Sequence, residues 1–278
     1  MKTHAQLHAE LARKFKDAGM SEASREARVL MAEYFKLDLA AALMRGDKPV
    51  EGTDERAILA WGAARARGEP LAYLSKRRGF YKHEFLVEPG VLVPRPETEL
   101  AVEIALKRAP TAKRVADLGA GTGCLGLSVI SDLPSAGLET IDLSPLAVKI
   151  TRQNAGRLNL SDRVIVHEGP VESWKPKRKF DLVTANPPYI PESDPNVEPG
   201  VHAFEPHLAL YSGADGLEAL RAWSAWAFEY LNHGGIFVCE FGAGQSARVL
   251  EIIRTIGFQE IEIVRDLAGI ERVVSARK

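Results

Sequence analysis

The sequence predicts an α/β protein in which a Rossmann-like, doubly wound sheet follows a small helical bundle and a β-hairpin. Three observations support this fold class. The first 70 or so residues show only helical spacing, residues 78–93 are rich in β-prone side chains, and from residue 97 onward strand-like and helical runs alternate. Such alternation is typical of a mostly parallel sheet with helices on both faces. The expected parts are 1–75, 76–95 and 96–278.

The N-terminal part is expected to be a bundle of short helices. One apolar stripe at spacings of three and four residues consists of Ala23, Ala27, Leu30, Met31 and Tyr34. A second stripe falls within residues 57–64. Neither stripe contains a group of catalytic side chains, so we expect the chemistry to lie later in the chain.

The connecting part is expected to be a hairpin. Residues 78–93 contain Phe80, Phe85 and Val91, and Glu88-Pro89-Gly90 supplies a turn signal. Pro94 and Pro96 then mark the entry to a helix that is predicted to begin near Glu97.

Seven strands and five helices are expected in the C-terminal part. The predicted strands are 114–118, 137–141, 163–167, 181–185, 235–241, 258–264 and 271–276. The predicted helices are 97–108, 123–132, 145–158, 214–232 and 244–256. In an open sheet of this kind ligands bind at the carboxyl ends of the strands.

A glycine-rich turn follows the first of these strands. Its residues are Gly119, Ala120, Gly121, Thr122 and Gly123, and a helix is expected to begin directly after them. Glycines let a backbone approach a ligand closely, and a helix N-terminus offers free N–H groups. Residues 121–126 also satisfy the Gly-x-Gly-x-x-Gly pattern, so a nicotinamide dinucleotide competes with other nucleoside cofactors.

Asp142 ends the second predicted strand of this part. A carboxylate at that position is placed to accept hydrogen bonds from ribose hydroxyls. NAD and S-adenosylmethionine both contain such a ribose, so Asp142 does not distinguish them. A helix-capping role is less favoured, because Ser144-Pro145 already supplies a good cap and first residue.

The motif Asn186-Pro187-Pro188-Tyr189 follows the fourth predicted strand of this part. Two adjacent prolines cannot donate to a ladder, so the chain must leave the sheet here with a stiff backbone. The amide oxygen of Asn186 and the carbonyl of Pro187 can each accept one hydrogen of an NH2 group, and Tyr189 can cover a planar face. This corner therefore indicates an acceptor with a planar NH2 group.

The glycine-rich turn, Asp142 and Asn186 all fall at carboxyl ends of predicted parallel strands. The topology therefore brings them to one edge of the sheet. The long segment 190–213 follows the motif, and loops of this length in compact domains are usually functional, so we expect it to cover the acceptor.

Composition narrows the classes of function. The chain has 278 residues, 46% hydrophobic and 26% charged, with a formal net charge of -1. This charge argues against a nucleic-acid substrate, although the basic clusters 76–78 and 175–179 exist. Two cysteines suit a reducing cytoplasm, and the seven histidines lack ligand spacing, so no metal is expected. Charged residues near the N-terminus interrupt any apolar run, so we expect neither a signal peptide nor a membrane span.

Taken together, these motifs resemble the seven-stranded S-adenosylmethionine-dependent methyltransferases, and within them the release factor glutamine methyltransferase family of N5-glutamine methyltransferases. The resemblance covers nearly the whole chain. Besides the motifs above, it is carried by Gly-Glu-Pro-Leu-Ala-Tyr at 68–73, Pro-Arg-Pro-Glu-Thr-Glu at 94–99, Phe-Glu-Pro-His-Leu-Ala-Leu at 204–210, Gly-Ala-Asp-Gly-Leu at 213–217, Asp-Leu-Ala-Gly at 266–269 and Arg-Val-Val at 272–274.

The resemblance implies a function and assigns roles to residues. S-adenosylmethionine would be the cofactor, and the substrate would be the glutamine of the Gly-Gly-Gln motif in peptide chain release factors, held by the N-terminal bundle. Catalytic roles would fall to Asn186, Pro187, Pro188 and Tyr189. Cofactor binding would fall to Gly119, Ala120, Gly121, Thr122, Gly123, Asp142, Val171 and Asn186.

The chain departs from the family pattern at one place. The family often has Gly-Asp or Ser-Asp after the third strand, whereas this chain has Gly169-Pro170-Val171. By position Val171 would lie near the adenine, and Trp174 either supplies a ring there or packs in the core. Thr98 and Glu99 are candidates for the methionine end of the cofactor, and Asp117 either orients its ammonium or holds the glycine-rich turn.

Three rival functions share part of this pattern. A ribosomal-protein glutamine methyltransferase would share every motif and differ in what the bundle holds. An adenine-N6 methyltransferase would require a basic channel at the mouth of the site. A non-catalytic nucleotide- or RNA-binding module would have no use for the Asn-Pro-Pro-Tyr corner.

Overall fold

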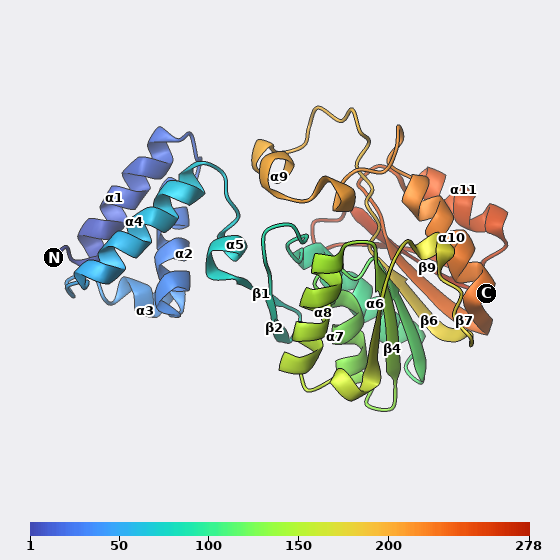
Figure 1. The fold of residues 1–278 in the computed structure, drawn as a ribbon. Helices are drawn as coiled ribbons and strands as arrows, with labels where there is room; N and C mark the ends of the chain where they lie inside the picture. The colour runs from blue at the N-terminus through green and yellow to red at the C-terminus, as the bar shows by residue number, and fades with distance from the viewer. The chain divides into compact units, whose positions relative to one another are not determined.

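The computed structural model describes all 278 residues, and the chain divides into two compact units (Figure 1). Unit 1 consists of Met1–Lys76 together with Val197–Phe204. Unit 2 consists of Arg77–Asn196 and Glu205–Lys278. None of the helices is both long and apolar enough to cross a bilayer.

Unit 1 is entirely helical, as predicted for the N-terminal bundle. Its helices are α1 (His4–Asp17), α2 (Ala23–Phe35), α3 (Leu39–Leu43), α4 (Gly52–Ala66), α5 (Leu71–Ser75) and α9 (Pro199–Phe204). Thr3 and Gln6 form a capping box that starts α1. Leu7, Leu11, Phe15, Leu30 and Ile58 form the buried core. Gly62 lets α1 approach α4 closely, because a Cβ at this position would lie 2.2 Å from Leu11 Cδ2.

Unit 2 contains the seven-stranded sheet that the sequence predicts. Its strands are β3 (Arg114–Leu118), β4 (Gly137–Asp142), β5 (Val164–Glu168), β6 (Phe180–Ala185), β7 (Leu231–Glu240), β8 (Gln259–Arg265) and β9 (Glu271–Arg277). Their order across the sheet is β5-β4-β3-β6-β7-β9-β8. The first five strands are parallel, whereas β9 pairs antiparallel with both β7 and β8. Strand order reverses at β3, which is where α/β sheets bind ligands.

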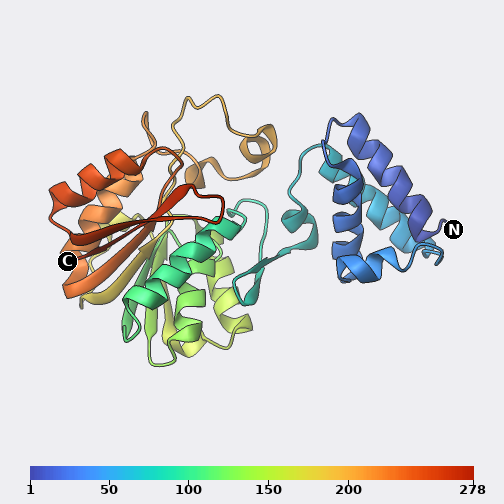
Figure 2. The same cartoon turned by 180° about the vertical axis from the view of Figure 1, so that it is seen from behind.

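Helices cover both faces of the sheet (Figures 1 and 2). They are α6 (Glu99–Arg108), α7 (Cys124–Asp132) and α8 (Pro145–Arg157) on one face, and α10 (Glu218–Tyr230) and α11 (Ser246–Ile256) on the other. Two cores result, and successive strand residues alternate between them. Val115 and Leu182 join the first core, while Ala116 and Val183 join the second.

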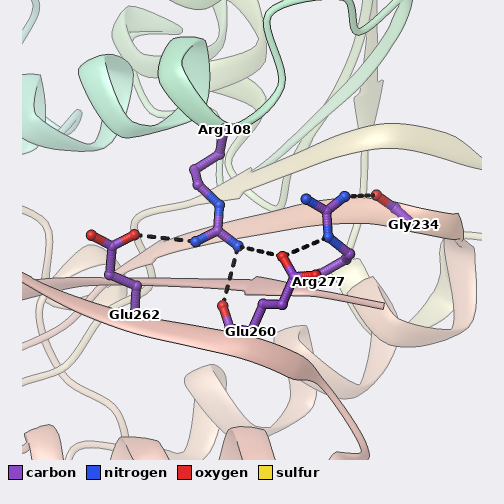
Figure 3. Close-up of polar contacts among 5 residues, drawn as sticks. All are labelled: Arg108, Gly234, Glu260, Glu262 and Arg277. Carbon is purple, nitrogen blue, oxygen red and sulfur yellow. Dashed lines mark hydrogen bonds and ion pairs between the residues drawn. The ribbon is translucent and has the colours of Figure 1, made fainter.

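An ionic network holds the antiparallel edge of the sheet to α6 (Figure 3). Arg108, the last residue of α6, donates to Glu262 Oε2 and to the Glu260 carbonyl oxygen, each at 3.1 Å. Arg277 donates to Glu260 Oε2 and to the Gly234 carbonyl oxygen, each at 2.8 Å. Both glutamates of β8 are exposed, so the network contributes more to strand register than to the free energy of unfolding.

The hairpin forms, but its turn is not where the sequence indicated. Its strands are β1 (Arg77–Phe80) and β2 (His83–Leu86), so Tyr81 and Lys82 make the turn. Tyr81 has a φ of 55°, an unusual value for an aromatic residue. Its hydroxyl donates to Asp132 at 2.9 Å, and Lys82 pairs with the same carboxylate. Glu88–Gly90 forms a separate turn that comes after the hairpin.

Segment 190–213 has more structure than a long loop. It contains α9 and the short 3-10 helix η4 (His207–Ala209). Its two ends meet, because Ile190 N donates to the Leu210 carbonyl at 2.9 Å and Ser212 N donates to the Ile190 carbonyl at 3.0 Å. The ends belong to unit 2, whereas Val197–Phe204 belongs to unit 1.

Candidate functional site

A cavity of about 640 Å³ lies in unit 2 at the carboxyl ends of β3, β4 and β6. This volume is in the range of small-molecule sites. The sequence-predicted residues that line it are Gly119, Gly121, Asp142, Val171, Asn186 and Pro188. Ala120 and Thr122 instead line a smaller neighbouring cavity, which Gly119, Gly121 and Asn186 also reach. Neither cavity is lined by Gly123, Pro187 or Tyr189. Within each motif, some residues therefore line a cavity and their sequence neighbours support its wall.

The glycine-rich turn is held by its own backbone. Gly119 N and Ala120 N both donate to the Ile141 carbonyl at 3.0 Å, and Gly123 N donates to the Ala120 carbonyl at 2.7 Å. Gly121 N donates to Asp142 Oδ2 at 2.8 Å. These N–H groups are therefore engaged within the protein, which differs from the phosphate cradle that the sequence pattern suggested.

Gly121 gives the cavity a flat backbone wall. It has a φ of 56°, and a Cβ built on it would meet no atom within 4 Å. Gly169 has the same open surroundings and also lines the cavity. Gly119 differs, because a Cβ at this position would lie 2.5 Å from the ring of Trp223. A side chain at Gly121 or Gly169 would thus fill space that is open to a ligand.

Asp142 presents a half-buried carboxylate to the cavity. Its Oδ1 accepts the Ser144 N–H and its Oδ2 accepts the Gly121 N–H, each at 2.8 Å. Burial raises the pKa of Asp142, and the two backbone N–H groups oppose that rise. Each oxygen keeps a second lone pair, so the group can accept two neighbouring hydroxyls, as a ribose would supply.

Asp117 supports the turn from beneath and also lines the smaller cavity, so both roles expected for it are compatible with its position. Its Oδ2 accepts the Gly126 N–H at 3.1 Å, and its Oδ1 accepts the Thr184 hydroxyl at 2.8 Å. Burial raises its pKa to about 7. Gly126 permits this contact, because a Cβ there would lie 2.8 Å from Asp117 Cβ. The third glycine of the Gly-x-Gly-x-x-Gly pattern therefore serves packing between α7 and β3.

Asn186 stands at the end of β6, where the two prolines end the strand. Its Nδ2 donates to Thr98 Oγ1 at 3.1 Å, so the NH2 end of the amide is engaged within the protein. The carbonyl oxygen Oδ1 is then the end that can accept a hydrogen from a ligand. Asn186 lines both cavities and so lies between them.

Tyr189 is tied to the interior. Its hydroxyl donates to Glu240 Oε1 at 3.3 Å, and its carbonyl accepts Gln245 Nε2 at 2.9 Å. Burial raises the pKa of Tyr189, and Glu240 raises it further. The tyrosine thus braces the Asn-Pro-Pro corner from behind the cavity wall.

Of the two candidates that follow β5, Val171 lines the cavity and Trp174 does not. Val171 is buried and lines the cavity. Trp174 stacks on Trp226 with ring centroids 4.8 Å apart, and the Trp226 indole donates to the Trp174 carbonyl at 2.8 Å. Trp174 therefore belongs to the core and does not line the cavity.

Sequence reasoning missed several lining residues. Leu143 is 49% exposed although it is large and apolar, and Trp223 and Glu218 enter from α10. The sequence could have indicated Leu143 as a lining residue, because it directly follows the carboxylate at the end of β4. The α10 residues had none, because only the packing of that helix decides which of its faces reaches the cavity.

The fold and the site define a seven-stranded methyltransferase. Residues 90–200 match the family model described as Methyltransferase small domain, and residues 6–75 match the PrmC N-terminal domain. Two solved structures share the fold. The ribosomal protein L11 methylase of Lactobacillus delbrueckii has a TM-score of 0.50 at 19% identity, covering 69% of this chain and 84% of that chain. The hMettl16 catalytic domain has a TM-score of 0.54 at 14% identity, covering 82% of both chains.

Curated relatives identify the particular family. The release factor glutamine methyltransferase of Geobacter sulfurreducens is 37% identical over 94% of this chain and 92% of its own length. That of Xylella fastidiosa is 38% identical over 91% of this chain and 92% of its own length. The chain belongs to the release factor glutamine methyltransferase family, whose cofactor is S-adenosylmethionine. The fold class and the family that the sequence indicated are thereby confirmed.

Proposed function

We propose that the protein transfers a methyl group from S-adenosylmethionine to the side-chain amide nitrogen of the glutamine in the Gly-Gly-Gln motif of peptide chain release factors. The observation that carries the substrate side of this proposal is the orientation of Asn186. Its Nδ2 donates a hydrogen bond to the Thr98 hydroxyl, which leaves Oδ1 as an acceptor at the wall of the cavity. An acceptor oxygen there suits a substrate that offers N–H groups.

The residues act by positioning an acceptor that is a poor nucleophile. The lone pair of an amide nitrogen is delocalised into its carbonyl. Asn186 Oδ1 accepts one N–H of the glutamine, and the Pro187 carbonyl, which lines neither cavity, is assigned the second N–H from its place in the motif. Both contacts raise electron density on the nitrogen and orient it. Most of the rate gain should come from this placement. Two prolines stiffen the backbone between the strand and Tyr189, so the two acceptors keep a fixed separation.

When bound, S-adenosylmethionine supplies an electrophilic methyl group on a sulfonium centre. The glutamine nitrogen forms the new N–C bond while the C–S electron pair goes to sulfur, and the nitrogen then releases one proton to water. No residue needs to act as a strong base, because the N-protonated amide that methyl transfer produces is a stronger acid than the hydronium ion and gives its proton to water.

Different residues of the cavity wall would contact different parts of the cofactor. Asp142 accepts the two ribose hydroxyls with the second lone pairs of its oxygens. Leu143, Val171 and Gly121 line the cavity. The first two would supply apolar surface for the adenine, and Gly121 would let the cofactor lie against the backbone. Thr98 lines the smaller cavity beside Ala120 and Thr122, where the methionine end would extend.

Unit 1 is proposed to hold the release factor outside its Gly-Gly-Gln tripeptide. It matches the PrmC N-terminal domain and has no catalytic group of its own. Its α3 end exposes large apolar side chains, with Leu39 at 48%, Leu43 at 57% and Met44 at 85%. Exposed apolar groups of this kind are common at protein contacts.

One incubation tests the assignment against its rivals. Radiolabelled S-adenosylmethionine would be supplied with purified release factor, with the same factor carrying glutamate for the glutamine, with ribosomal protein and with duplex or single-stranded DNA. We expect label only on release factor with glutamine, because a carboxylate offers no N–H to Asn186 and repels both acceptor oxygens. Faster labelling of DNA or ribosomal protein would replace this assignment with the corresponding rival.

A further inference from the structure

A buried polar network lies behind Asn186. The Asn186 amide donates to Thr98 Oγ1 at 3.1 Å, and the Thr98 hydroxyl lies close enough to the carboxyl group of Glu240 to lower the pKa of that group. The Tyr189 hydroxyl donates to Glu240 Oε1 at 3.3 Å. Thr98 and Glu240 are each 1% exposed. Both the first and the last residue of the Asn-Pro-Pro-Tyr motif are therefore connected to one carboxyl group at the end of β7.

The donors and acceptors of this network allow only one assignment of which group donates in each hydrogen bond. An amide NH2 group can only donate, so Thr98 Oγ1 accepts from Asn186. The single hydroxyl hydrogen of Thr98 is then free to go to Glu240, and Tyr189 sends its own hydroxyl hydrogen to the same carboxyl group. Glu240 therefore acts toward both hydroxyls as an acceptor.

Glu240 lies in an environment that is unfavourable for a carboxyl group. Its Oε2 is buried and has no hydrogen-bond partner. Burial raises its pKa to about 7, the Thr98 and Tyr189 hydroxyls and Arg272 oppose the rise, and Glu97 adds to it. A half-satisfied buried carboxyl group destabilises a fold, and such groups in native proteins call for a functional explanation.

We propose that Glu240 and Thr98 are positioning residues that fix the direction of the Asn186 amide, with Nδ2 toward Thr98 and Oδ1 toward the acceptor nitrogen. The proposal rests on the acceptor role of Asn186 in the proposed function. A flipped amide would turn its NH2 group toward the NH2 group of the substrate, so donor would face donor. It would also require Thr98 to donate to Oδ1, and that would take the hydroxyl hydrogen away from Glu240.

The test compares Thr98→Val, Thr98→Ser and Glu240→Gln in the full-length protein. Valine keeps the shape and removes the hydroxyl, serine keeps the hydroxyl, and glutamine replaces one acceptor oxygen with a donor. Single-turnover methylation of release factor and the dissociation constant of S-adenosylmethionine would be measured for each. We expect Thr98→Val and Glu240→Gln each to slow methyl transfer about tenfold or more, and Glu240→Gln, whose side chain lines neither cavity, to keep cofactor affinity within threefold. Thr98→Ser should stay within threefold of the wild-type rate.

A second measurement separates positioning from general support. Thr98→Val and Glu240→Gln would be combined with Asn186→Ala. If both residues act through Asn186, they slow the Asn186→Ala enzyme by less than twofold, because effects through one group are not additive. A further tenfold loss in that background, or a full rate for Thr98→Val alone, overturns the inference. Failure of the wild-type protein to methylate release factor would instead overturn the proposed function.

Discussion

Gly121 donates its backbone N–H to the Asp142 carboxylate at 2.8 Å, so the glycine-rich turn and the strand-end acid form one structural unit. The second carboxylate oxygen accepts the Ser144 N–H at the start of α8. Asp142 thus holds the turn after β3 and the start of α8 together while it lines the cavity. A substitution at Asp142 changes both ligand contact and loop geometry, and the variants below are chosen to separate the two.

Asp142→Ala should weaken S-adenosylmethionine binding by about 1.5–3 kcal/mol, because a charged acceptor for two hydroxyls is lost. Asp142→Asn is the control, since it retains one oxygen for the Gly121 or Ser144 N–H. Calorimetry should give the asparagine variant an intermediate affinity. Unchanged affinity in the alanine variant would remove Asp142 from the cofactor site, and tight binding of NAD by the wild type would overturn the cofactor.

Gly121→Ala should reduce cofactor affinity more than tenfold, because its Cβ would occupy open space at the cavity wall. Part of any effect would come from the left-handed backbone, which costs a residue with a Cβ about 1 kcal/mol. Gly269→Ala supplies the matched control, as Gly269 has a φ of 79°, no atom within 4 Å of a Cβ, and no place in the cavity. Equal affinities for the two variants in calorimetry would contradict the assignment.

Asn186→Ala should slow the methyl-transfer step by at least about 30- to 150-fold, equivalent to 2–3 kcal/mol, if the residue both orients and polarises the glutamine amide. Cofactor affinity should remain within a few-fold, because Asp142 and the glycine-rich turn are unaffected. Single-turnover kinetics checks the rate and calorimetry the affinity. A rate above one tenth of wild type would contradict the acceptor role.

Deletion of residues 1–76 should leave a folded unit 2 that binds S-adenosylmethionine but fails on intact release factor. The cavity is lined only by residues from Gly90 onward, so cofactor binding should survive. A short Gly-Gly-Gln peptide is the control substrate, and its methylation should fall much less than that of the intact factor. Wild-type activity of the truncated protein on intact release factor would show that unit 1 does not hold the substrate.

Glu240→Gln should stabilise the protein at pH 8 while slowing catalysis. The pKa of Glu240 is raised from 4.5 to about 7, so between these pH values the folded state binds a proton that the unfolded state has released. Stability contributed by this group therefore falls as pH rises from about 4.5 to 7, by up to about 3 kcal/mol. Thermal unfolding of both proteins should differ most at pH 8 and least near pH 4.5. A variant less stable than wild type at pH 8 would contradict this.

Local sequence determined the repeating part of the fold. β3 spans the residues that its apolar run predicted, β4 and β6 are each one residue longer than predicted, and β5 is shifted by one residue at both ends. β3, β4 and β6 are largely buried, and all four strands are β-prone between turn signals, so composition and turns are enough to locate them. The helix expected at 214–232 begins at Glu218 instead, because Gly213 and Gly216 adopt positive φ and Asp215 accepts the Leu217 N–H. The strand β7 then begins at Leu231.

By itself the sequence determined which chain segments end at the functional edge of the sheet, and it indicated the class of ligand. Glycine, proline and acidic residues at strand ends act on the local backbone, so their effect can be recognised from the sequence alone. Tertiary structure alone decided how these residues are used. The turn N–H groups bind protein acceptors, Trp174 packs in the core while Leu143 lines the cavity, and Glu240 from β7 lies behind Asn186. These outcomes depend on contacts between residues far apart in the chain, which no local pattern specifies.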